Sequence, residues 1–256
     1  MTELPYQDQI EHVIFRTAEE RFGEMVRKSG RLASAIKDLS DYYIADPGVR
    51  GRCPDTPAHR AVRMLFFTLA DMPKAYLAAA ECDALTGTHN KPTTRILDIG
   101  AGYGAQSLGL LTYLATLDAG RPMHIDLVDR DRYALESFGA ALANFRETAL
   151  FNNVSHTALR LNLEKPLHLK ETYDYIIAGN TLCELRPATY HPLAMNLLSS
   201  LSDTGVVFLI EPALKKTARN LHALRDTLLE SGQCRVIAPC TRTGGCPCLG
   251  TPNDWC

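Results

Sequence analysis

The sequence predicts an α/β fold in which a parallel sheet follows a helical N-terminal region. Three observations support this prediction. Residues 1–90 contain no strand pattern, and their apolar residues recur at helical spacing. From Arg95 onward, short apolar runs alternate with amphipathic helical segments, which is typical of a parallel sheet covered on both faces. The first apolar run ends in three alternating glycines, Gly100, Gly102 and Gly104, which lead directly into a helical segment.

The size and composition indicate a soluble globular protein. With 256 residues, of which 46% are hydrophobic, the chain can bury a full core. No apolar run approaches the ~18 residues that span a bilayer, and the acidic residues 1–11 resemble neither a secretory signal nor an Arg-rich transit peptide. We therefore expect a cytoplasmic protein with no membrane partner, whose eight cysteines are reduced thiols. The oligomeric state does not follow from the sequence.

The N-terminal region, residues 1–90, is predicted to contain three helical blocks, at 6–22, 24–45 and 59–86. The third block is the most apolar, so we expect it to pack against the rest of the fold. Pro73 stands where a new helix can begin with proline in its first turn. Residues 86–94, which include Gly87, Asn90 and Pro92, are the expected linker to the second region.

A local excess of positive charge lies in this N-terminal region. The whole chain has a net charge of −2, which argues against a general nucleic-acid binder. Residues 21–63, however, contain nine Arg or Lys residues against five acids. Such a basic strip could face RNA phosphates, and it could equally be a solvated helix face. The nine are Arg21, Arg27, Lys28, Arg31, Lys37, Arg50, Arg52, Arg60 and Arg63.

The glycine motif spans residues 95–104 and predicts a strand, a tight turn and a helix over 105–117. Glycine lets the backbone turn sharply and approach a ligand closely. Gly100, Gly102 and Ala105 also satisfy a dinucleotide-binding pattern. Asp98 favours a different ligand, because a carboxylate at a strand end suits a cation, and S-adenosylmethionine (SAM) carries an ammonium and a sulfonium. The spacing of Asp98, Gly100, Gly102 and Gly104 resembles the first motif of class I SAM-dependent methyltransferases.

The next two strands supply further candidate cofactor residues. A strand over 123–128 ends at Asp129, whose carboxylate can accept from two vicinal ribose hydroxyls. Asp131 is the fallback for that role, although it is better placed as the N-cap of a helix over 132–149. A third strand over 155–161 is followed by Asn162. Asn162 is the candidate residue for contacting the edge of the adenine ring, at a position where methyltransferases often make this contact.

The fourth strand, residues 173–178, runs into a loop, residues 179–185, that would face the transferred methyl group. This loop contains neither the Asn/Asp-Pro-Pro-Tyr pattern of amino-group methylation nor the Pro-Cys pattern of pyrimidine methylation. Asn180 and Glu184 are its catalytic candidates, and Glu184 could equally lie on the surface of the following helix. Transfer would then depend on holding a nucleophile in line with the methyl group.

The remaining strands complete the predicted second region, residues 91–238. A fifth strand over 205–210 ends in Glu211-Pro212, a helix follows over 213–231, and a sixth strand is expected over 234–237. The seven-stranded methyltransferase sheet requires one more, antiparallel strand. Residues 238–256 carry no strand pattern, so we expect a sheet without its last strand or a chain that stops short of its natural end.

The last segment, residues 239–256, contains four of the eight cysteines in a run rich in glycine and proline. Such a run does not readily bury thiols in an apolar core. The spacing, C-x5-C-x-C-x7-C, departs from the C-x2–4-C pairs common in structural zinc sites, which favours an iron–sulfur cluster and leaves zinc as the alternative. The candidate metal ligands are Cys240, Cys246, Cys248 and Cys256.

Several of these motifs together resemble the methyltransferase-like family of the small ribosomal subunit, of the mitochondrial Rsm type, over roughly residues 60–256. They are the glycine motif 98–104, Tyr173-Asp174, Glu211-Pro212, Ala238-Pro239-Cys240, Cys246-Pro247 and Asp254-Trp255-Cys256. The resemblance implies a Rossmann-like class I methyltransferase fold that binds SAM, a [4Fe–4S] cluster, and work on small-subunit rRNA or subunit assembly. It matches Cys240, Cys246 and Cys256, and Cys248 is the candidate fourth ligand.

Three hypotheses follow. The leading one is a SAM-dependent methyltransferase that acts on small-subunit rRNA or a ribosomal component. The second is a non-catalytic assembly factor that binds SAM and a cluster, which the missing catalytic signature in residues 179–185 favours. The third, an NAD-dependent oxidoreductase, depends only on the match of Gly100, Gly102 and Ala105 to the dinucleotide pattern.

Overall fold

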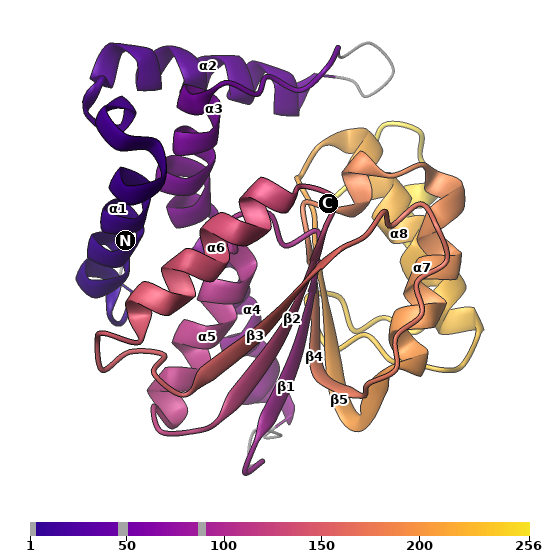
Figure 1. The fold of residues 1–256 in the computed structure, drawn as a ribbon. Helices are drawn as coiled ribbons and strands as arrows, with labels where there is room; N and C mark the ends of the chain where they lie inside the picture. The colour runs from indigo at the N-terminus through magenta and orange to yellow at the C-terminus, as the bar shows by residue number, and fades with distance from the viewer. Residues whose placement is uncertain (1–3, 46–50, 87–90) are drawn as a thin grey trace.

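The computed structural model describes residues 4–45, 51–86 and 91–256 (Figure 1). The centre of the expected linker, residues 87–90, and Arg50 of the basic strip lie outside the described residues. A five-stranded sheet with the strand order β3-β2-β1-β4-β5 forms the middle layer, and every neighbouring pair of strands is parallel. The α/β prediction is therefore confirmed, as is the helical N-terminal region.

The strands align so that several carboxyl ends lie together. The bounds are β1 Thr94–Ile99, β2 Met123–Asp129, β3 Val154–Arg160, β4 Tyr173–Gly179 and β5 Leu201–Ile210. In the register, Ile99 of β1 pairs with Val128 of β2 on one side and with Ala178 of β4 on the other. The chain moves from β1 outward to β3 and then returns to β4, so the strand order reverses between β1 and β4. Ligands of open parallel sheets bind at such a reversal.

The N-terminal helices occupy the predicted blocks. They are α1 Gln7–Phe22, η1 Gly23–Arg27, α2 Ser29–Ile44, α3 Pro57–Val62, η2 Arg63–Phe67 and α4 Thr68–Thr86, of which η2 is a short π-helical turn. Pro73 lies inside α4, so the expectation that it begins a new helix is wrong. Because it is the sixth residue of α4, its missing N–H removes one internal hydrogen bond, the one to the carbonyl of Leu69.

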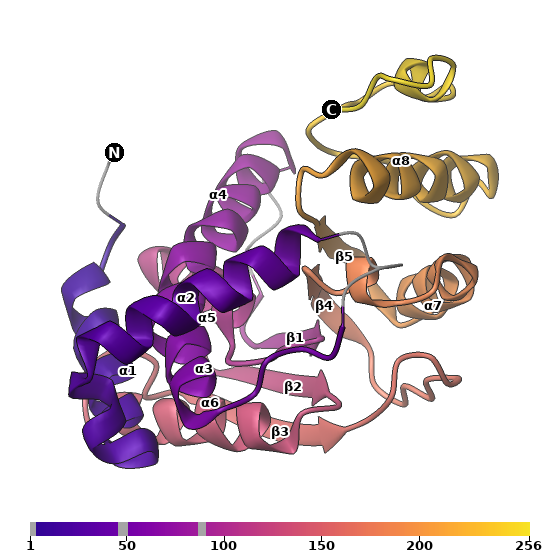
Figure 2. The same ribbon diagram turned by 90° about the horizontal axis from the view of Figure 1, so that it is seen from above.

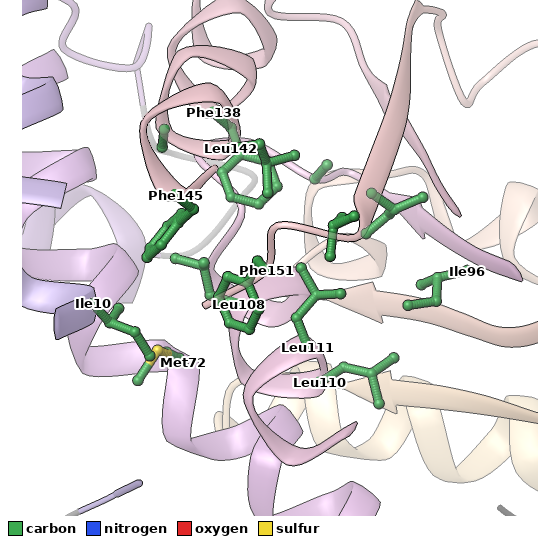
Figure 3. Close-up of a cluster of buried hydrophobic side chains, with 14 of the residues drawn as sticks. Ile10, Met72, Ile96, Leu108, Leu110, Leu111, Phe138, Leu142, Phe145 and Phe151 are labelled. Atoms are coloured by element: carbon green, nitrogen blue, oxygen red, sulfur yellow. The ribbon is translucent and has the colours of Figure 1, made fainter. Parts of the chain in front are cut away.

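One face of the sheet is covered by α5 (Ala105–Leu117), α6 (Arg132–Phe145) and the N-terminal helices (Figures 1 and 2). Apolar side chains of α1, α4, α5 and α6 form one buried cluster with the sheet, so α1 and α4 share a core with it. Those of α2 and α3 form a separate cluster. Figure 3 shows the cluster shared with the sheet, in which the labelled residues include Ile10 of α1, Met72 of α4, Leu108 of α5, Phe138 of α6 and Ile96 of β1.

Glycine at position 109 allows α4 and α5 to pack closely. A Cβ atom placed on Gly109 would lie 2.1 Å from the backbone oxygen of Met72. Any larger residue would therefore push the start of α4 away from α5. This contact brings the start of α4 next to the start of α5, which lies at the carboxyl edge of the sheet.

The other face is covered by α7 (Pro187–Ser199) and α8 (Lys215–Glu230), with another buried cluster beneath them. The sixth strand expected over 234–237 is wrong, since the described residues after α8 contain no strand. Cys234 and Ile237 are partly buried and pack against the two clusters on the sheet, so their apolar character reflects packing and not pairing in the sheet. No helix in the described ranges is long and apolar enough to cross a membrane.

Candidate ligand site at the carboxyl edge of the sheet

The glycine turn after β1 requires glycine for both conformation and space. Gly100, Gly102 and Gly104 have φ values of 71°, 51° and 84°, in the left-handed region. A Cβ atom on Gly100 would lie 2.2 Å from Thr181 Oγ1, and one on Gly104 would lie 2.3 Å from the Phe138 ring. The turn ends at Gly104, which is the N-cap of α5. It therefore brings the N-terminus of a helix to the carboxyl edge of the sheet, an arrangement suited to an anionic group.

Asp98 lies beneath this turn and not on its surface. Its side chain is 1% exposed, and Ser107 Oγ donates a hydrogen bond of 2.5 Å to its Oδ2. Burial raises the pKa of Asp98 to about 7, and the bond from Ser107 lowers it in part. A nearby cation would stabilise the ionised form, so the position fits an acid that responds to a cationic ligand.

Asp129, at the end of β2, holds the glycine turn in place. Its Oδ2 accepts the N–H of Gly102 at 2.9 Å, and its Oδ1 accepts the N–H of Asp131 at 2.7 Å. Burial raises the pKa of Asp129, while these backbone donors lower it. Asp131 caps α6, since its carboxylate accepts from the N–H groups of Tyr133 and Ala134. The cap interpretation of Asp131 is therefore confirmed.

The loop after β4 is fixed by Glu211, at the end of β5. The Glu211 carboxylate accepts the N–H groups of Thr181, Leu182 and Cys183 at 3.0, 2.7 and 3.1 Å. Burial raises the pKa of Glu211 and the backbone donors lower it. In addition, the Thr181 hydroxyl donates to the carbonyl of Ile99 at 2.9 Å, which ties this loop to the end of β1. In the sequence, Glu211 marks the end of a strand and belongs to a motif of the family resemblance, and no pattern indicates its contact with this loop.

Asn180 occupies a strained position in this loop, and its side chain has one partner. Its φ of 54° lies in the left-handed region, which is uncommon outside glycine. Its Nδ2 donates to Asp71 Oδ2 of α4 at 2.8 Å, whereas its Oδ1 is buried with no hydrogen-bond partner among the described residues. Gln106 of α5 is 5% exposed, and its Oε1 is likewise buried with no hydrogen-bond partner among the described residues. Asp71 and Gln106 were not predicted.

The other two predicted residues of this edge are engaged with neighbours. Glu184 lies in η3 (Leu182–Glu184) and accepts from Arg130 at 3.1 Å, which connects the loops after β4 and β2. Asn162 is exposed, and its Oδ1 accepts the N–H of Glu164 at 3.0 Å, as in a turn after β3. The structure thus brings Asp98, the three glycines, Asp129, Asn180 and Glu184 to one edge, and gives Asn162 a local role in its own loop.

Much of the basic strip is paired with acids. The Tyr133 ring also lies between two of its guanidinium groups, with Arg21 Cζ at 4.7 Å and Arg60 Cζ at 4.5 Å from the ring centroid. The local charge excess is therefore smaller than a count along the sequence indicates. The pairs are Arg21–Glu136, Arg27–Glu19, Lys37–Asp41, Arg60–Asp55 and Arg63–Asp55.

Arg219 of α8 holds the cysteine tail, residues 239–256, against this helix. Arg219 Nη1 donates to the backbone carbonyls of Cys248, Thr251 and Asp254 at 2.7 to 2.8 Å, and Nη2 donates to that of Leu249 at 3.2 Å. A single guanidinium therefore organises a turn that spans the last nine residues.

This turn brings some of the predicted metal ligands together. The Sγ atoms of Cys248 and Cys256 are 3.5 Å apart, and the N–H of Cys246 donates to Asp226 of α8 at 2.7 Å. Cys240 is exposed. Within the part of the chain that the structure describes, no group of three or more His, Cys, Asp or Glu residues could hold a metal ion. The four thiols do not form one site in this arrangement.

Comparison with known proteins gives one match at the level of a family. The family model of the mitochondrial small ribosomal subunit protein Rsm22 matches residues 62–256. No curated protein matches the chain.

Solved structures match parts of the chain at low identity. PKMT2 from Rickettsia typhi, solved with AdoHcy, is 23% identical with a TM-score of 0.39, over 53% of this chain and 24% of that one. The CcbJ methyltransferase from Streptomyces caelestis is 21% identical with a TM-score of 0.39, over 54% and 48%. A SAM-dependent methyltransferase from Leishmania major is 20% identical with a TM-score of 0.43, over 68% and 59%. This chain thus spans less than two thirds of each, and at these TM-scores the likenesses carry no argument about activity.

Proposed function

The chain belongs to the mitochondrial small ribosomal subunit Rsm22 family, and from this premise we propose that it is a SAM-dependent methyltransferase of the small ribosomal subunit. Its methyl acceptor would be small-subunit rRNA or another component of that subunit. The family match supports the ribosomal part of the proposal. The chemistry of the carboxyl edge of the sheet supports the SAM part.

The observation that carries the proposal is the left-handed glycine turn held between Asp98 and Asp129 where the strand order reverses. The N-terminus of α5, which follows the turn, would hold the carboxylate of SAM. Asp129, whose oxygens each keep a second lone pair, would accept from the ribose hydroxyls. Asp98 would stabilise the positive charge from beneath. The bound cofactor supplies an activated methyl group.

Two unpartnered oxygens at this edge also fit a ligand. Asn180 Oδ1 and Gln106 Oε1 are buried without a hydrogen-bond donor, and such groups in native proteins usually have a partner. Hydrogen-bond donors on a bound molecule would satisfy them. The nicotinamide alternative has no comparable support beyond the glycine spacing.

Catalysis would depend on position more than on an acid and base pair. Glu184, the ionisable candidate in the loop, is held by Arg130, and Asn180 carries a neutral amide. Transfer would therefore be accelerated by holding the nucleophile in line with the methyl group. The same observation favours the second candidate function, a SAM-binding assembly factor of the small subunit that does not transfer the methyl group.

The tail does not, as folded, fit a four-thiol cluster, because the described residues contain no group of three or more His, Cys, Asp or Glu that could hold a metal. The [4Fe–4S] cluster, with zinc as the alternative, stays a prediction, as does the cytoplasmic location. Iron, sulfide and zinc analysis of anaerobically purified protein checks the first of these.

Incubation of the protein with labelled SAM and immature small subunits tests the proposed function. Wild type should transfer label, and Asp98→Ala should lose SAM binding and transfer together. Binding without transfer, combined with a requirement for the protein in subunit assembly, would favour the assembly factor. Failure of wild type to bind SAM would contradict both candidate functions.

A further inference from the structure

The helix α4, which precedes the sheet in sequence, contributes a residue to the ligand site. Gly109 of α5 allows the backbone of α4 to approach at Met72, where a Cβ atom would lie 2.1 Å from the carbonyl oxygen. Asp71 stands one residue before this contact, and its Oδ2 accepts from Asn180 Nδ2 at 2.8 Å. Its other oxygen accepts from Lys74 at 2.5 Å, which holds the carboxylate in place.

This contact determines which way the Asn180 amide points. A carboxylate accepts hydrogen bonds and cannot donate one when ionised, so Asp71 faces the NH2 group of Asn180 and excludes the reverse orientation. The oxygen of the amide is consequently turned away from Asp71. It is buried with no partner in the described part of the chain. Leaving a buried acceptor unpaired is costly, so this orientation is unfavourable without a ligand.

The Asn180 backbone is fixed as firmly as its side chain. Its N–H donates to the carbonyl of Ile210 at 2.7 Å, and the next three N–H groups are held by Glu211. These bonds maintain the left-handed φ of 54°. Strain that the surroundings maintain in this way is characteristic of functional positions.

A second unpartnered acceptor belongs to Gln106, which contacts the residue before Asn180. Gln106 packs across Gly179, the residue before Asn180, so closely that a Cβ atom on Gly179 would lie 2.2 Å from Gln106 Cγ. Gln106 is 5% exposed, and its Oε1 also has no partner. Two amide oxygens without donors thus belong to the residue that follows β4 and to the first turn of α5, and the Gln106 side chain packs against the glycine that precedes Asn180.

We propose that Asn180 Oδ1 and Gln106 Oε1 accept hydrogen bonds from an N–H-bearing group of the bound ligand, an amine or ammonium, and that Asp71 orients Asn180 for this role. The inference rests on the proposed function. Neutral amide oxygens accept from nitrogen without removing its proton, so they select and position the group. The group is either the ammonium of the methyl donor or a nitrogen at the point of methyl transfer.

Three nucleosides distinguish these sources by isothermal titration. S-adenosylhomocysteine carries the ammonium, 5′-methylthioadenosine lacks it, and sinefungin adds an amine where SAM carries its methyl group. Gln106→Met and Asn180→Gly each remove one acceptor, and glycine tolerates the left-handed backbone. If the acceptors face the transfer point, each variant loses about tenfold in affinity for sinefungin and keeps its affinity for the other two.

If the acceptors hold the ammonium of the donor, S-adenosylhomocysteine and sinefungin weaken equally, by about tenfold, and 5′-methylthioadenosine does not. Asp71→Asn should change affinities in the same pattern by a smaller factor, because its amide permits either orientation of Asn180. Asn196→Leu is the matched control, since Asn196 Oδ1 is a buried unpartnered oxygen on α7 at the other face. It should change none of the three affinities.

The inference is overturned if folded Gln106→Met and Asn180→Gly bind all three nucleosides within twofold of wild type. Thermal unfolding establishes that each variant is folded. If wild type binds none of the three nucleosides, the proposed function is contradicted. If wild type binds them tightly and the variants bind them equally tightly, only this further inference is contradicted.

Discussion

Replacement of Asp98 by asparagine should stabilise the protein without ligand and weaken the binding of SAM. The amide is close in shape to the carboxyl group and keeps an acceptor for the Ser107 hydroxyl. It cannot ionise, so it removes the cost of a buried negative charge. Stability and binding should therefore change in opposite directions, as is common where a residue is retained for function.

The magnitude follows from the pKa. Burial raises the pKa of Asp98 from 3.8 to about 7, so the folded protein holds this proton more tightly than the unfolded chain does. The stability that the proton contributes is lost as the pH rises through about 7. One pKa unit is worth about 1.4 kcal/mol, so the free energy of unfolding of Asp98→Asn should exceed that of wild type by about 1 kcal/mol at pH 4.5 and about 4 kcal/mol at pH 8.

Urea unfolding at a series of pH values from 4.5 to 8 measures this difference. Ser107→Ala serves as a second variant, since loss of the hydroxyl donor should raise the pKa of Asp98 further and carry the pH-dependent loss of stability to higher pH than in wild type. S-adenosylhomocysteine should stabilise wild type increasingly as the pH rises toward 7 and should stabilise Asp98→Asn much less. A difference between Asp98→Asn and wild type that stays constant across this range would refute the reasoning.

Three further predictions concern the turn, the loop and the tail. Gly104→Ala should lower the free energy of unfolding by about 2–4 kcal/mol, from the left-handed φ and the clash with Phe138, whereas Gly30→Ala, in an open part of α2, should be neutral or stabilising in the same thermal unfolding assay. Glu211→Gln should cost about 2–4 kcal/mol, because one amide oxygen cannot accept all three N–H groups; unchanged thermal stability would contradict the role of Glu211. Arg219→Leu should expose residues 246–256 to limited proteolysis and thiol labelling, while Arg235→Leu, at an exposed position, should not.

The sequence predicted the elements whose signal is local. Helical spacing located the N-terminal helices, apolar runs located five strands, and the spacing of Asp131 before a helix identified its cap. The expected strand over 234–237 was wrong because its apolar residues pack on the cores without a strand partner. Apolar runs of this length do not distinguish the two cases.

The contacts that complete the site depend on packing between distant segments. Asp71 reaches Asn180 only because Gly109 allows α4 to approach α5. Gln106 packs across the end of β4 only because Gly179, the residue before Asn180, leaves room for its side chain. No periodicity or motif in the sequence connects residues 109 positions apart, so the acceptor pair and its orienting carboxylate emerge from the structure alone.

Equilibrium binding of S-adenosylhomocysteine to the folded protein tests the central claim most directly. The account predicts saturable binding by wild type in isothermal titration, lost in Asp98→Ala, which removes the buried carboxylate. A folded wild-type protein that shows no binding of S-adenosylhomocysteine or of SAM would contradict the claim that the glycine turn and its two flanking acids form a methyl-donor site.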